Sequence, residues 1–120
     1  MKRILAVDDS TSVRALQKAV LAGAGYEVVQ AVDGKDALDQ LGKTTVNLII
    51  TDLNMPNLDG LGLIKAVRSG GPHRMVPIIM VTTESQDEKK QAGRAAGATA
   101  WIVKPFSPDQ LVGVVKKVIG

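Results

Sequence analysis

Five polar side chains follow short apolar runs of this sequence, at four separate places along the chain. They are Asp8, Asp9, Asp52, Thr82 and Lys104. Apolar runs of this length are typical of strands that are buried on both faces of a parallel sheet. In an open parallel α/β sheet the functional site lies beyond the carboxyl ends of the strands, so we expect these side chains to line one crevice.

Three carboxylates, a hydroxyl and an ammonium in one crevice predict metal-assisted phosphoryl transfer. Carboxylates within about 5 Å repel, and at an effective dielectric constant of ~20 each pair costs roughly 3 kcal/mol before screening. Mg²⁺ relieves this repulsion and suits a site with few carboxylates and several retained waters. In such a site Lys104 and Mg²⁺ would neutralise the phosphoryl oxygens while Asp52 attacks in line and forms an acyl phosphate.

Each of these positions also has a structural explanation. Asp8 and Asp9 are suited to cap a helix, and Asp52, Thr82 and Lys104 each suit a strand end or a turn. For each position alone this explanation is at least as good as the chemical one. The coincidence of all of them at carboxyl ends of strands favours a functional site.

The remaining candidates for chemistry are weaker. Asp33, Asp36 and Asp39 belong to no such set, and we interpret them as charges on a helix face. The single histidine, His73, follows Gly70-Gly71-Pro72 and is expected to be a solvated loop residue rather than part of a catalytic triad.

The elements that position these residues alternate between apolar runs and segments of helical period. The runs are residues 4–7, 28–29, 46–50, 78–81 and 100–103. The helical stripes are Val13, Leu16, Val20 and Leu21; Ala37, Leu38 and Leu41; Leu61, Ile64 and Val67; and Leu111, Val114, Val115, Val118 and Ile119. Cap signals mark the helix boundaries at Ser10, Asp33-Gly34, Asp59-Gly60 and Ser107-Pro108. This order predicts an α/β fold, a doubly wound (βα)₅ sheet of five parallel strands. The mostly polar segment 85–94 is expected to form the most exposed helix.

Composition excludes several classes of protein. The 120-residue chain has no cysteine, which excludes a disulfide scaffold and a cysteine-based zinc site. No apolar stretch approaches the ~20 residues of a membrane span.

The charges are distributed unevenly along the chain. Residues 1–60 carry six Lys/Arg and eight Asp/Glu, whereas residues 61–120 carry nine Lys/Arg and four Asp/Glu. With only three aromatic residues in the chain, the basic half favours a protein partner over nucleic acid. We expect a cytoplasmic monomer without nucleic-acid or membrane binding.

Together, the motifs Asp8-Asp9, Asp52, Thr82-Thr83-Glu84 and Lys104-Pro105-Phe106 resemble the signature of bacterial response-regulator receiver domains. The resemblance spans the whole chain, and the chemotaxis regulators of the family are the most similar. It implies a flavodoxin-like strand order of 2-1-3-4-5. It also implies a signalling switch, not an enzyme that turns over a separate substrate, with a histidine kinase as phosphodonor.

The resemblance implies a role for each matching position. Asp8, Asp9, Asp52 and the backbone carbonyl of Asn54 would bind Mg²⁺, and Asp52 would accept the phosphoryl group. Lys104 would hold the phosphate beside a cis Lys104–Pro105 bond. Thr82 would move its hydroxyl onto the phosphate and let Trp101 turn inward. The last two helices and the fifth strand, which carry Lys89, Lys90, Arg94, Lys116 and Lys117, would then bind a target protein.

Four further positions bear on how long the phosphoryl group lasts, on access to Asp52 and on how the surface responds. Asn54 and Glu84 occur as in chemotaxis-type regulators and predict a short-lived phosphoryl group. Thr83 replaces a small residue that is common in the family and narrows the access to Asp52. Trp101 replaces a tyrosine or phenylalanine, and its alternative role is that of a half-buried packing residue.

Four functional classes are weighed at this stage. A stand-alone switch over residues 1–120 is favoured, because the chain ends at Ile119-Gly120 with no linker. A receiver domain from a larger regulator or hybrid kinase is the alternative. A haloacid-dehalogenase-like phosphatase is disfavoured, because it requires a second aspartate where this chain has Asn54. A flavodoxin-like cofactor binder is disfavoured because Asp8 and Asp9 would repel its phosphate.

Overall fold

Five parallel strands form one sheet in the order β2-β1-β3-β4-β5. The computed structural model describes residues 1–83 and 87–120. The strands are β1 (Arg3–Val7), β2 (Glu27–Ala31), β3 (Leu48–Thr51), β4 (Ile78–Thr82) and β5 (Ala100–Val103). The helices are α1 (Thr11–Gly23), α2 (Gly34–Leu41), α3 (Gly60–Arg68), α4 (Asp87–Ala96) and α5 (Pro108–Ile119). The predicted fold class and strand order are confirmed.

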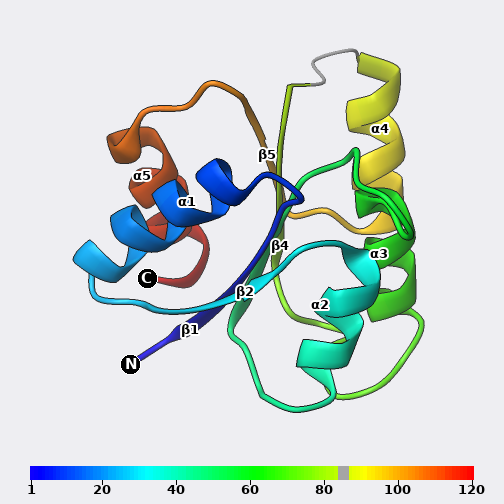
Figure 1. The fold of residues 1–120 in the computed structure, drawn as a ribbon. Coiled ribbons are helices and arrows are strands. Elements are labelled where there is room, and N and C mark those ends of the chain that lie inside the picture. The colour runs from blue at the N-terminus through cyan, green and yellow to red at the C-terminus, as the bar shows by residue number, and fades with distance from the viewer. Residues whose placement is uncertain (84–86) are drawn as a thin grey trace.

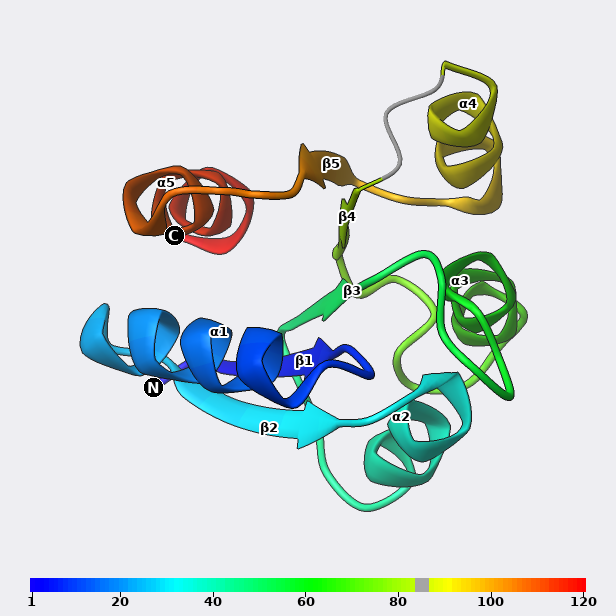
Figure 2. The same cartoon turned by 45° about the horizontal axis from the view of Figure 1, so that its top comes forward.

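The helices cover both faces of this sheet. Helices α1 and α5 lie on one face, and α2, α3 and α4 lie on the other (Figure 1). Figure 2 shows the same two layers from a second direction, with the sheet between them. Each face has its own buried apolar cluster, centred on Leu5, Ile49 and Met80 on one side and on Ile4, Ile50 and Ile79 on the other.

The three central strands are apolar along almost their whole length because both of their faces are covered. All residues of β3 and β4 are buried, as are the last four of β1. The edge strands differ from the expectation of full burial, since Val28, Val29 and Trp101 are half-buried. The third strand begins at Leu48, two residues later than its apolar run predicts.

The predicted caps begin four of the helices. Ser10, Asp33, Asp59 and Ser107 each accept a hydrogen bond from a backbone N–H in the first turn of the helix that follows. The interpretation of Asp33 as a charge on a helix face is wrong. Its side chain is buried at the start of α2, where it caps the helix.

Helix α1 presents its apolar stripe differently from the prediction. Leu21 is buried, but Leu16 is 46% exposed, and Gln17 is buried instead. The side of α1 that faces the sheet therefore includes Gln17 and Leu21, and Leu16 points away from it. The consequence is an apolar side chain on the surface, near the carboxyl end of the sheet.

His73 is buried, which contradicts the expectation of a solvated loop residue. It is 8% exposed, and its Nε2 accepts a hydrogen bond from the backbone N–H of Val46 at 3.3 Å. The histidine thus joins the α3–β4 loop to the segment before β3. An isolated loop histidine gives no local signal of such a contact.

Helix α4 has a single buried residue, Gly93, in agreement with the predicted exposure of this segment. Among the described residues, no helix combines the length and the apolar character needed to cross a membrane.

Candidate functional site

The carboxyl ends of the central strands bring three aspartates together. Asp8 follows β1 and Asp52 follows β3, and these strands pair so that Val7 lies beside Thr51. Each of Asp8, Asp9 and Asp52 has a carboxylate oxygen within 4.8 Å of the others. Two neighbouring strands in parallel register therefore place residues 44 positions apart at one site.

Lys104, which follows β5, reaches two of these carboxylates. Its Nζ lies 2.7 Å from Oδ2 of Asp8 and 3.2 Å from Oδ2 of Asp52. Burial by itself would lower the pKa of Lys104, but the hydrogen bond to Asp8 and the charges of Asp52 and Asp8 outweigh it. The net effect is a raised pKa, so the ammonium stays charged at neutral pH.

Backbone groups fix the orientation of both buried carboxylates. Oδ1 of Asp52 accepts a hydrogen bond from the N–H of Leu53 at 2.7 Å, and Oδ1 of Asp8 accepts one from the N–H of Ser10 at 2.9 Å. Nη1 of Arg14 donates to the backbone carbonyl of Asp8 at 2.6 Å. Each carboxylate therefore presents one oxygen to the backbone and the other to Lys104.

The arrangement suits a hard cation. Asp8 is 1% exposed and Asp52 is 9% exposed, whereas Asp9 lies at the surface. Three oxygen-bearing side chains converge, and Lys104 is the one ammonium in contact with them among the described residues. This donor set of carboxylate oxygens, open to solvent on the Asp9 side, fits Mg²⁺ with retained waters.

Thr82 and Asn54, which are also predicted site residues, belong to the segments next to this cluster. Thr82 ends β4 and is buried, and its carbonyl accepts a hydrogen bond from the N–H of Lys104 at 2.8 Å. Asn54 is exposed in the loop after Asp52. The Lys104–Pro105 peptide bond is cis, as the family resemblance implies. Glu84 lies outside the described residues.

The loop between β3 and α3 carries Asp52 and Asn54, and it is held by residues that sequence reasoning did not select. Asn57 has φ 69°, and its amide donates to Oδ2 of Asp33 at 2.6 Å. The Asp33-Gly34 and Asp59-Gly60 pairs signalled helix starts, but nothing local indicated that the first pair contacts this loop.

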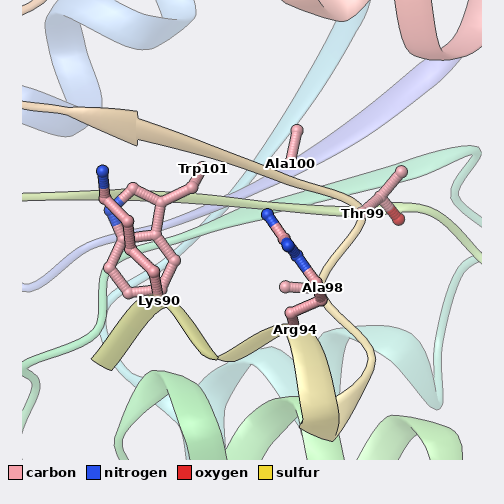
Figure 3. Close-up of a pocket in the computed structure, with 6 residues that line it drawn as sticks. All are labelled: Lys90, Arg94, Ala98, Thr99, Ala100 and Trp101. Atoms are coloured by element: carbon pink, nitrogen blue, oxygen red, sulfur yellow. The ribbon is translucent and has the colours of Figure 1, made fainter. Parts of the chain in front are cut away.

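Trp101 belongs to the edge strand β5 and packs against α4, on the face of the sheet that α2, α3 and α4 cover. A Cβ atom added to Gly93 would lie 2.8 Å from Cζ3 of the indole, so the ring occupies the space that this glycine leaves open. Lys90 and Arg94 extend from α4 toward β5 and, with Trp101, line a small pocket (Figure 3). The surface beside β5 thus combines an aromatic ring with two cations.

A second, mostly apolar groove borders the carboxylate cluster. It runs between α1 and the segment after β5, and it is lined by Val13, Leu16, Thr83, Lys104, Pro105 and Phe106. Lys104 belongs both to this groove and to the cluster. The exposed Leu16 therefore lies on a surface that leads to Asp52.

Comparison with known proteins gives consistent matches. The family model described as response regulator receiver domain matches residues 4–116. The chain is 39% identical to chemotaxis protein CheY1 of Helicobacter pylori over 120 residues, which cover 98% of this chain and 97% of that protein. It is 38% identical to the probable transcriptional regulator ycf27 of Porphyridium aerugineum, covering 98% of this chain, and spans only 48% of that relative's length.

Solved structures show the same likeness. Chemotaxis protein CheY4 of Vibrio cholerae superimposes with a TM-score of 0.94 at 47% identity, covering 98% of both chains. The response regulator TrrA of Thermotoga maritima, solved in complex with Mg(2+)-BeF, superimposes with a TM-score of 0.87 at 35% identity, covering 98% of this chain and 99% of that one.

Proposed function

Because the chain belongs to the response-regulator receiver-domain family of two-component signalling, we propose that it is a phosphorylation-dependent switch with Asp52 as phosphate acceptor. The observation that carries this proposal is the contact of Lys104 with both Asp8 and Asp52 beside the carboxylate cluster. The family is a regulatory one, and we propose that this member modifies itself rather than turning over a separate substrate.

The cluster is the proposed Mg²⁺ site. Asp8, Asp9, Asp52 and the backbone carbonyl of Asn54 would hold the ion, with all-oxygen ligands as Mg²⁺ prefers. When bound, the ion supplies positive charge that offsets the phosphoryl oxygens. The Mg²⁺ in the structure of the relative TrrA supports this choice of metal.

In phosphoryl transfer, a carboxylate oxygen of Asp52 attacks the phosphorus of a phosphohistidine on the kinase. A P–O bond to Asp52 forms, the P–N bond breaks, and its electron pair stays on the imidazole of the donor. Lys104 then donates to a phosphoryl oxygen, a role that its position within hydrogen-bond distance of Asp52 supports.

Dephosphorylation is a separate step, a hydrolysis tuned by Asn54 and, on the family pattern, by Glu84. We propose that the Asn54 amide orients a water whose oxygen attacks phosphorus. A P–O bond to the water oxygen forms, the P–O bond to Asp52 breaks, inorganic phosphate with the water protons leaves, and the carboxylate returns. Because the side chain is exposed two residues after Asp52, water has access to it. A lifetime of hours for the Mg²⁺-loaded phosphoprotein would contradict this role.

The output is a change on the surface of α4, β5 and α5. We propose that the Thr82 hydroxyl moves onto the phosphoryl group and that Trp101 follows it inward. Lys89, Lys90, Arg94, Lys116 and Lys117 belong to α4 and α5, and this basic character favours a target with acidic residues. Trp101 packs partly against the core, which makes it a link between site and surface.

The histidine kinase must bind close to Asp52 to transfer its phosphoryl group. The mostly apolar groove between α1 and the segment after β5 includes Lys104, and we propose that the kinase docks there. We propose a cytoplasmic monomer in which residues 1–120 form one receiver domain. A second candidate is a receiver domain of a larger regulator, because the chain spans about half of the relative ycf27. Expression of the natural gene product and its intact mass distinguish the two.

The test of the central proposal is incubation with acetyl phosphate and Mg²⁺, followed by intact-mass measurement. We expect the mass of one phosphoryl group to appear, and to be absent in Asp52→Asn and in EDTA. Asp59→Asn is the matched control, because it changes an aspartate of the same loop that caps α3 and does not belong to the cluster. A phosphoryl group that persists on Asp52→Asn would refute Asp52 as the acceptor.

A further inference from the structure

The β3–α3 loop, residues 52–59, is anchored to α3 at its base. The N–H of Gly60 donates to the carbonyl of Leu53 at 2.8 Å. A Cβ atom on Gly60 would lie 2.3 Å from the carbonyl oxygen of Asp52, so α3 packs directly against the backbone of the phosphate acceptor. This anchor restrains the Asp52 end of the loop, but it does not reach its outer part.

The outer part of the loop is held by the start of α2. The Asn57 amide donates to Oδ2 of Asp33 at 2.6 Å, and the N–H of Gly34 donates to the carbonyl of Leu58 at 3.1 Å. A Cβ atom on Gly34 would lie 2.5 Å from that same carbonyl oxygen. Two consecutive loop residues therefore contact the first turn of α2 at close range.

Asp33 is a rigid partner for this contact. Its Oδ1 accepts a hydrogen bond from the N–H of Asp36 at 2.8 Å, and the residue is 7% exposed. The hydrogen bonds from the Asp36 backbone and from the Asn57 amide lower the pKa of Asp33, so the acceptor is ionised at neutral pH. The backbone of Asn57 has φ 69°, in the left-handed region, which asparagine tolerates better than most residues.

We propose that Asp33 and Asn57 are positioning residues for the Mg²⁺ site. Their hydrogen bond fixes the outer part of the loop, whereas the α3 anchor restrains its Asp52 end. The pair would thereby keep the Asn54 carbonyl beside the Asp52 carboxylate and set the affinity for Mg²⁺. This inference rests on the proposed function, since it requires Asp52 and Asn54 to be ligands. Residues that hydrogen-bond directly to metal ligands typically contribute 10–100-fold to affinity. Because this pair acts on the ligands only through the loop, an effect at the lower end of that range is expected.

The test measures Mg²⁺ binding to folded protein by calorimetry, with Mg²⁺ alone as the probe. Asn57→Asp keeps the size and the left-handed tendency of the residue but sets two carboxylates against each other. We expect Mg²⁺ affinity to fall about tenfold. The added negative charge by itself would strengthen cation binding, so a loss separates the positioning effect from general electrostatics.

A reciprocal exchange provides the rescue. In the double variant Asp33→Asn with Asn57→Asp, the amide and the carboxylate change places, and we expect affinity within about twofold of the original chain. The matched control combines Asp36→Asn with Asn57→Asp. This control has the same net charge as the reciprocal exchange and also removes a carboxylate at the start of α2. It leaves the carboxylate of Asp33 opposite the new carboxylate at position 57, so the affinity for Mg²⁺ should stay low. Asn57→Gly keeps the positive φ without the amide and should lose affinity to the same extent.

Two outcomes overturn the inference alone. One is a folded Asn57→Asp or Asn57→Gly that binds Mg²⁺ within twofold of the original chain. The other is a control double variant whose Mg²⁺ affinity recovers as fully as that of the reciprocal exchange. In that case the hydrogen bond between residues 33 and 57 would not be what sets the affinity. If the original chain itself shows no Mg²⁺ binding, the proposed function fails together with this inference, and the first titration reveals it.

Discussion

The Nζ atom of Lys104 lies closer to Oδ2 of Asp8, at 2.7 Å, than to Oδ2 of Asp52, at 3.2 Å. The stronger contact is thus made with the most buried carboxylate of the cluster, whose side chain is 1% exposed. Lys104 balances a charge that water cannot reach, and it remains beside the proposed phosphate acceptor. Replacing either partner should therefore affect both stability and metal binding.

Replacement of Lys104 by methionine should destabilise the protein by about 1–3 kcal/mol without Mg²⁺, since a buried carboxylate then lacks its partner. The same variant should bind Mg²⁺ more tightly, because the competing ammonium is gone. Urea unfolding with and without Mg²⁺ measures both effects. Lys89→Met, on the exposed face of α4, is the control; an equal loss there would contradict the pairing.

Asp52→Asn should raise the free energy of unfolding by about 1 kcal/mol without Mg²⁺, because it relieves repulsion from two carboxylates at the cost of one ion pair. It should also weaken Mg²⁺ binding at least tenfold. Thermal unfolding and calorimetry give the two quantities. Unchanged Mg²⁺ affinity would be incompatible with Asp52 as a ligand.

The contribution of Asp33 to stability should depend on pH in the acidic range. Its pKa is lower in the folded protein than in the unfolded chain, so folding is favoured above the unfolded pKa of about 3.9. That advantage is lost as the pH falls through the folded pKa. The difference in unfolding free energy between the original chain and Asp33→Asn should shrink below about pH 4. A difference independent of pH would argue against an ionised Asp33.

Gly93→Ala should displace the indole of Trp101, because the new methyl group would lie 2.8 Å from its Cζ3. We expect a change in tryptophan emission. The gain of up to about 1 kcal/mol that alanine brings to a helix should be offset by the clash. Gly113→Ala in α5 has no neighbour within 4 Å of the new methyl group, so it should stabilise the protein with unchanged emission. Identical emission in both variants would rule out the contact.

His73→Ala should destabilise the protein by about 1–3 kcal/mol, because the buried N–H of Val46 loses its acceptor. His73→Gln offers another acceptor and should recover part of the loss. Phosphorylation of Asp52 should be unaffected, because His73 joins loops that precede β3 and β4, at the end of the sheet away from the carboxylates. Denaturant unfolding and phosphorylation by acetyl phosphate measure the two. Slower phosphorylation in the folded His73 variants would contradict the expectation that His73 affects stability alone.

Local sequence determined the elements and the edge at which chemistry is expected. Apolar runs, helical stripes and caps such as Ser10 and Ser107 act between residues a few positions apart, so each is visible in its own segment. The strand ends then place Asp8, Asp52 and Lys104 at one edge once the strands are parallel. For these reasons the fold class was predictable, and the carboxylate cluster was predictable with it.

Tertiary structure alone decided how distant residues meet. Asn57 contacts Asp33 across 24 positions, and His73 contacts Val46 across 27. Such contacts depend on how helices and loops pack on the finished sheet, and no periodicity encodes them. The same packing left Leu16 at the surface although its spacing placed it in the apolar stripe. The carboxylate cluster therefore follows from local order, whereas the contacts that hold the loop beside it follow from the packing of distant residues.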